Sequence, residues 1–137
     1  MNDVIEQMLA AMNRQDVEAA AALMHEDYRS EQPLHPDRAF VGRAQMRANW
    51  TAMFAGVPDF RAQVRNSAQS GRTVWTEWDW SGTRTDGGPF HLAGVTLFDI
   101  EDGQVVAGRL FMEEVDEDGG GIAEAVRTLS GQEPQGP

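Results

Sequence analysis

Residues 72–82 read RTVWTEWDWSG and carry the clearest structural signal in the chain. Successive side chains of a β-strand point to opposite faces, so residues two apart share a face. One face of this segment would carry a mostly apolar set, Val74, Thr76, Trp78 and Trp80. The other face would carry Trp75, Glu77 and Asp79. The alternation predicts a strand whose first face lies in the protein interior.

The same period-two pattern continues on both sides of this segment. It predicts strands at about 59–67, 72–83, 90–100 and 104–115, separated by the turn sequences SG, TDGGP and EDG. Strands joined by such short turns pair in antiparallel order. The second half of the chain is therefore expected to form an antiparallel meander.

Helical spacing of apolar residues dominates the first half of the chain. It predicts three helices, at about 3–14, 16–25 and 43–56. The intervening segment 30–42, SEQPLHPDRAFVG, contains two Pro and is expected to form a loop or a short edge strand. Helices that precede a run of antiparallel strands indicate the α+β class, with the helices covering one face of the sheet.

The length of 137 residues suits a single core, and we expect one domain over residues 1–117. The remaining residues, 118–137, contain three consecutive Gly, the helical pattern IAEAVRTL and the polar end GQEPQGP. They are expected to form a short helix followed by a flexible tail.

Composition excludes several classes of function. A net charge of −11 opposes binding to nucleic acid or to an anionic membrane, because phosphate contacts require clustered Lys and Arg. No apolar run approaches the ~20 residues that span a bilayer, and the N-terminus does not resemble a signal peptide, so a cytoplasmic location is expected. The chain has no Cys, and His25, His35 and His91 are dispersed, so we expect no metal site. The motifs GxGxxG and GxxxxGK[ST] are also absent, and no cofactor is expected.

Further segments occur in a recognisable order: MNRQD at 12–16, HEDYRSEQP at 25–33, GRAQMR at 42–47, WSGTRTDG at 80–87 and GVTLFDIEDGQVVAGRLFMEEVD at 94–116. Together they resemble the nuclear transport factor two-like superfamily, and within it the SnoaL-like, polyketide cyclase-like subgroup. The superfamily includes ketosteroid isomerases, limonene epoxide hydrolases, scytalone dehydratases and polyketide cyclases. The resemblance implies a cone-shaped fold in which three N-terminal helices pack on a curved antiparallel sheet and enclose a pocket.

The catalytic positions of two of these enzyme groups carry other residues here. Counted from the shared segments, the phenol, base and oxyanion-hole acid of ketosteroid isomerase fall on Met8, Gln32 and Thr96. None of these three side chains can abstract or donate the proton that the isomerase reaction needs. The Arg and two Asp of limonene epoxide hydrolase fall on Trp78, Trp80 and Leu110. A one-residue register slip would instead turn Glu77, Asp79, Arg109 and Glu113 inward.

The residues themselves give two groups of candidates for a site. The predicted ligand-binding wall is largely aromatic and aliphatic and consists of Met8, Trp50, Phe54, Trp78, Trp80, Thr96, Phe98, Leu110 and Met112. Gly94 and Gly108 are expected to leave room for the ligand beside it. Glu31, Gln32 and His35 lie in the loop where the family places reactive groups, and they are the catalytic candidates. The alternative for the side chains of the wall is that they simply fill a packed core. The alternative for the three loop side chains is that they are exposed to solvent and have no catalytic role.

The sequence thus favours a SnoaL-like pocket protein for a small apolar metabolite, such as a cofactor-independent isomerase, cyclase or hydrolase. The alternative is a non-catalytic ligand-binding or dimerisation module that keeps the fold without the acid–base residues. Trp75, Leu97 and Phe111 share the face opposite the proposed pocket, where His91 also lies. A homodimer through that face of the sheet is expected, because such apolar patches are seldom left in water.

Overall fold

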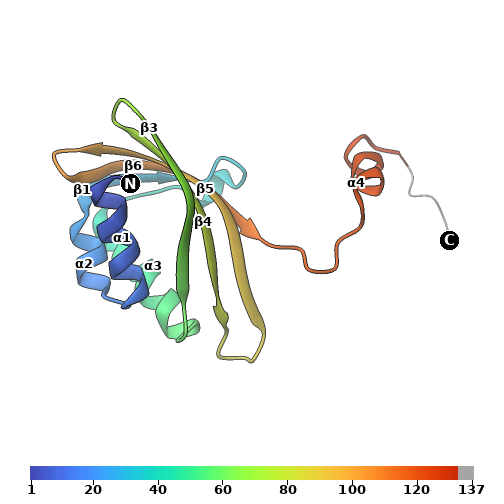
Figure 1. Cartoon of the computed structure of the whole chain (residues 1–137), viewed down its shortest axis with the longest axis horizontal. Coiled ribbons are helices and arrows are strands. Elements are labelled where there is room, and N and C mark those ends of the chain that lie inside the picture. Colours follow the sequence, from blue (N-terminus) through green and yellow to red (C-terminus); the bar gives the residue numbers. More distant parts are fainter. Residues whose placement is uncertain (133–137) are drawn as a thin grey trace.

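A computed structural model describes residues 1–132 of the chain, and Figure 1 shows helices packed against one face of a curved sheet. The helices are α1 (Asp3–Asn13), α2 (Val17–Ala22), α3 (Arg43–Gly56) and α4 (Ile122–Leu129), with a short 3₁₀ turn at Pro36–Arg38. The strands are β1 (Met24–Glu31), β2 (Phe40–Val41), β3 (Arg61–Ser70), β4 (Thr73–Thr83), β5 (Pro89–Glu101) and β6 (Gln104–Glu114). The expected α+β class is confirmed.

Within residues 1–132, the sheet has six strands in the order β2-β1-β6-β5-β4-β3. Its β3–β6 part is the antiparallel meander that the sequence predicts. The predicted boundaries of these four strands lie within a few residues of the observed ones. β1 joins the meander in parallel with β6, and β2 pairs with β1 at the edge.

The segment after α2 corrects the sequence interpretation. The sequence predicts a second helix that continues to about His25, but α2 ends at Ala22 and His25 lies in strand β1. A register shift between Met24 and Arg29 interrupts the pairing of β1 with β6. Because such an irregularity breaks the alternation of faces, the polar sequence MHEDYRSE shows no period-two signal.

The face assignment of β4 is confirmed. Val74, Thr76, Trp78 and Trp80 are all buried, while Trp75 on the opposite face is 47% exposed. The β4–β5 ladder runs without a shift from Thr73 opposite Asp99 to Thr83 opposite Pro89. The alternative register, which would turn Glu77 and Asp79 inward, is therefore not the one that this fold adopts.

One side chain ties α1 to the sheet, and another caps α2. The Asn13 side chain at the end of α1 donates to the carbonyl oxygen of Ala62 (3.0 Å) and accepts from the Ala62 amide (2.7 Å). These bonds satisfy backbone groups of the edge strand β3 that have no further strand to pair with. Asp16 caps α2, since its Oδ1 accepts from the Ala19 amide at 3.0 Å.

The α4 helix occupies the range of the IAEAVRTL pattern. Figure 1 shows it at the end of an extended segment, away from the sheet and the other helices. The expected flexible end falls largely on residues 133–137, which lie outside the described residues.

Candidate functional site

The interior cavity is lined by most of the side chains that the sequence assigns to a ligand wall. Seven of the nine line it: Met8, Trp50, Trp78, Trp80, Thr96, Phe98 and Leu110. Phe54 and Met112 lie in the same core but not at the cavity. The cavity measures about 20 Å³, which suffices for about one water molecule, whereas small-molecule sites measure roughly 300–1,000 Å³. In this conformation the wall is a packed core.

The two glycines expected to leave room for a ligand are in tight contact instead. A Cβ on Gly94 would lie 1.9 Å from the carbonyl oxygen of Phe111, and one on Gly108 would lie 2.5 Å from Oη of Tyr28. Both glycines therefore serve close packing between neighbouring elements.

One polar group of the cavity wall is left without a partner. Trp78 Nε1 donates to Thr96 Oγ1 at 2.8 Å. The Trp80 indole N–H is also buried, and nothing in residues 1–132 accepts its hydrogen bond. A buried donor in this state would be satisfied by an acceptor atom from water or from a ligand.

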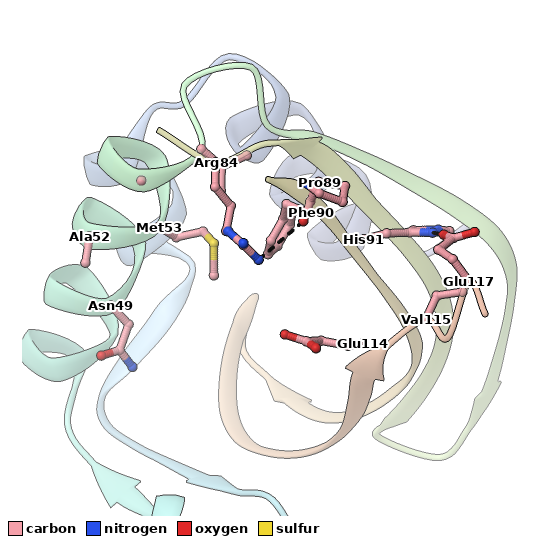
Figure 2. Close-up of a pocket in the computed structure, with 12 residues that line it drawn as sticks. Asn49, Ala52, Met53, Arg84, Pro89, Phe90, His91, Glu114, Val115 and Glu117 are labelled. Atoms are coloured by element: carbon pink, nitrogen blue, oxygen red, sulfur yellow. Dashed lines mark hydrogen bonds and ion pairs between the residues drawn. The ribbon is translucent and has the colours of Figure 1, made fainter. Parts of the chain in front are cut away.

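A larger concave site lies at the rim of the fold, between α3, the β4–β5 turn and the end of β6. It is a groove of about 800 Å³, within the size range of small-molecule sites. Its lining combines apolar and ionisable side chains: Asn49, Ala52, Met53, Gly56, Val57, Arg84, Pro89, Phe90, His91, Glu114, Val115 and Glu117. Figure 2 shows Arg84 and Glu114 extending into it from opposite sides.

The turn between β4 and β5 fixes the position of Arg84. Asp86 Oδ1 accepts from the Gly88 amide at 2.9 Å and from Arg84 Nε at 3.1 Å. These hydrogen bonds hold the pKa of Asp86 below its ordinary value, and the bond from the Gly88 amide has the larger effect. Arg84 Nη1 also donates to the carbonyl oxygen of Pro89 at 3.4 Å. The guanidinium is thus held by its own turn, and its remaining N–H groups can contact a ligand.

The alternation of side chains along β6 places Glu114 on the inner face of the sheet, at the groove. It follows Leu110 and Met112 at two-residue intervals on β6 and pairs with Leu92 of β5, so it continues the inner face at the rim. Its carboxylate takes part in no hydrogen bond or ion pair among the described residues. Across the groove, Asn49 Oδ1 accepts from Gln45 Nε2 at 2.7 Å, which leaves the Asn49 amide nitrogen as a donor.

His91 marks the outer edge of the groove. Its Nε2 lies 3.2 Å from Asp79 Oδ2, and its Nδ1 lies 3.2 Å from Glu117 Oε1. These contacts raise the pKa of His91 above its ordinary value, and the contact with Asp79 has the larger effect. Asp79 also accepts from Arg65 Nη2 at 2.9 Å. The hydrogen bonds from Arg65 and from His91 lower the pKa of Asp79, and the bond from Arg65 has the larger effect. His91 therefore joins the sheet to the segment that follows β6.

The three loop residues proposed from the sequence as catalytic do not line the groove or the interior cavity. Glu31 is exposed at the end of β1. The Gln32 side chain accepts from Arg38 Nη1 at 3.1 Å. His35 Nε2 lies 2.5 Å from Glu113 Oε1. Glu113 lies on the opposite face of β6 from Glu114, so the loop packs against the outer side of the sheet.

Sequence reasoning missed Glu114 and Arg84, although a signal for each exists. Counting by two from Leu110 along β6 reaches Glu114 on the inner face. The TDGG turn that follows Arg84 is the kind of sequence that fixes a hairpin end. Across residues 1–132, no cluster of three or more acidic or His side chains could hold a metal ion, and no helix is long and apolar enough to cross a bilayer.

Comparison with known proteins identifies relatives of this fold. The family model described as SnoaL-like domain matches residues 5–108. Comparison with curated proteins gives no match.

Several solved structures share the fold. A proposed SnoaL-like polyketide cyclase from Jannaschia sp. CCS1 is 23% identical, with a TM-score of 0.70 over 81% of this chain and 83% of that one. IdmH from Streptomyces antibioticus, proposed to be a polyketide cyclase, is 23% identical, with a TM-score of 0.69 over 81% of this chain and 90% of that one. A Catenulispora acidiphila protein of ketosteroid isomerase-like fold, solved with trimethylamine, is 15% identical, with a TM-score of 0.72 over 97% and 95% of the chains.

Proposed function

The chain belongs to the SnoaL-like domain family, and from this premise we propose that it binds a small, largely apolar metabolite in the rim groove and catalyses a proton transfer on it without a cofactor. Isomerisation, cyclisation and hydrolysis are the reaction classes that such a transfer would serve. The observation that carries the proposal is the presence of a carboxylate and a guanidinium in one apolar groove, with the guanidinium already held by its own turn.

The two charged groups suit complementary roles. The Glu114 carboxylate would take a proton from a carbon next to a carbonyl group, which leaves a protonated Glu114 and an enolate. Arg84 and the Asn49 amide would donate hydrogen bonds to the enolate oxygen, where negative charge develops. Return of the proton to another carbon gives an isomer. Attack of the enolate carbon on a second carbonyl of the same molecule closes a ring, and the protonated Glu114 returns its proton to the alkoxide that forms.

The apolar part of the groove suits the body of such a ligand. Met53 and Phe90 are half-buried and contribute apolar surface, and the buried Val57 also lines the groove. Phe60 packs against Phe90 at a ring-centre distance of 5.9 Å and against Trp80 at 6.0 Å. The aromatic side chains of Phe90, Phe60 and Trp80 therefore link the groove to the cavity wall.

Hydrogen exchange at a carbon acid tests the chemical role. We would use 2-tetralone and a panel of small aromatic ketones and β-diketones in deuterated buffer, with exchange next to the carbonyl followed by NMR. Glu114→Gln should lower the protein-catalysed rate by roughly 10²- to 10⁴-fold, the usual contribution of a general base. Glu113→Gln is the matched control, because it lies one residue away on the opposite face and should leave the rate unchanged. Equal rates in the wild type and Glu114→Gln would contradict the catalytic role.

The alternative function is a ligand-binding module without catalysis. It is supported by the replacement of the isomerase acid–base positions with Met8, Gln32 and Thr96, two of which line the packed cavity. A ligand that binds the wild type and Glu114→Gln with similar affinity, without any turnover by the wild type, would favour this second function.

A further inference from the structure

The α4 helix is too short to be stable by itself. It has eight residues, and isolated helices below about 12 residues are marginal in water. Ile122, Val126 and Leu129 follow one another at helical spacing and form a stripe along one side. These three side chains are 80%, 53% and 87% exposed. Glu124 projects from the opposite side, so the helix could bury its apolar stripe and keep this charge in water.

The segment that carries α4 is rooted on the rim of the groove. The Val115 amide donates to the carbonyl oxygen of His91 at 3.0 Å, and Glu117 Oε1 contacts His91 Nδ1 at 3.2 Å. Val115 and Glu117 both line the groove. Five residue steps separate Glu117 from Ile122, a reach of about 17 Å when extended. Three of the intervening residues, 119–121, are glycines, which allow the chain to reverse direction.

We propose that α4 folds back as an intramolecular lid over the groove, with its apolar stripe packed on Met53 and Phe90. Within residues 1–132 neither the apolar part of the groove nor the helix stripe is covered by another element, and a short tether rooted at the rim joins them. Such a tether gives α4 a high effective concentration at its own groove, which favours this occupant over a second copy of the chain. The open arrangement in Figure 1 is then the state that admits a ligand.

Closure would cover Glu114 and remove bulk water from it. The docking itself does not depend on the proposed reaction, whereas its role in controlling access to the groove rests on the proposed function. A test of docking without substrate therefore separates the two ideas.

The absence of Cys from the chain makes a single spin label straightforward. A nitroxide at Ser130→Cys in the full-length chain should broaden away the amide NMR peaks of residues 49–57 and of Phe90. Leu129→Asp, which places a charge in the stripe, should restore those peaks. Glu124→Ala, on the opposite side of the helix, should leave them broadened.

A groove variant guards against simple loss of the helix. Met53→Glu alters the docking surface and leaves α4 unchanged, and it should restore the same peaks. Wild-type spectra without broadening, or equal broadening in Leu129→Asp, would overturn the proposal. Broadening that appears only between molecules, in a mixture of spin-labelled chain and ¹⁵N-labelled chain without the spin label, would show that a second copy is the occupant and would also overturn it.

Discussion

The side chain of Arg84 depends on a neighbouring glycine. A Cβ built on Gly88 would lie 2.3 Å from Arg84 Nη2, a separation that real atoms do not adopt. Because the guanidinium is the flexible end of a side chain, Gly88→Ala should displace it at little cost in stability.

We expect Gly88→Ala to shift the NMR resonance of the Arg84 Nε–H group and to change the free energy of unfolding by no more than about 0.5 kcal/mol. Gly121→Ala is the control, since a Cβ there meets nothing within 4 Å. An unchanged Arg84 resonance in Gly88→Ala would show that the turn does not hold the guanidinium as described.

His91 and Asp79 give the fold a pH dependence whose sign follows from their pKa shifts. The folded-state pKa of His91 is raised above its ordinary 6.5, so its contribution to stability is fully present below that value and is lost as the pH rises through the raised pKa. The folded-state pKa of Asp79 is lowered from 3.8, so its contribution is present above that value and is lost as the pH falls through the lowered pKa.

The stability difference between the wild type and His91→Gln should therefore be greatest between about pH 4 and pH 6.5, and it should shrink at higher pH. Urea unfolding of both proteins across this range measures the difference. A difference that grows above pH 7 would contradict the assigned contacts of His91.

At the scale of the elements, the β5–β6 ladder depends on Gly94. This residue has φ of +153°, a backbone conformation that L side chains rarely adopt, and a Cβ there would meet the backbone carbonyl of Phe111. Backbone cannot move aside as a side-chain end can, so Gly94→Ala should be strongly destabilising.

We expect a loss at or above the ~1–3 kcal/mol typical of overpacked sites, measured by thermal or urea unfolding. Gly56→Ala should be neutral or slightly stabilising, because its Cβ would be free of contacts at the end of α3. Equal stability of the two variants would contradict the described packing of β5 on β6.

Alternation of side chains predicted the meander because each of its strands buries one face and exposes the other. Trp78 and Trp80 were placed correctly for that reason. The sequence pattern did not predict β1, because its pairing is interrupted between Met24 and Arg29 and because its sequence is polar. The groove escaped prediction because it joins α3, the β4–β5 turn and the end of β6, which no local pattern connects. Packing density at Gly94 and Gly108 is likewise set by elements distant in sequence.

At the scale of the whole molecule, the outer face of the sheet offers a surface for self-association. Trp75 is 47% exposed there, whereas Leu97 on the same face is already buried within the chain and Phe111 is half-buried. The apolar patch is thus centred on Trp75. We propose that two copies pair through this face, in keeping with the patch that the sequence indicated.

Sedimentation at micromolar concentration should show a dimer for the wild type. Trp75→Glu should shift the protein to a monomer, because a carboxylate would be buried at the centre of the interface. A monomeric wild type would exclude this mode of association.

We propose that the rim groove, with Arg84 and Glu114, is the ligand site of this SnoaL-like domain. The most direct measurement is NMR titration of the ¹⁵N-labelled chain with 2-tetralone and the related ketones. Shift changes that saturate and cluster at Asn49, Met53, Phe90 and Glu114 are the predicted result. Changes that cluster instead on the outer side, around Glu31, His35 and Arg109, would contradict the claim, and so would the absence of saturable binding across the panel.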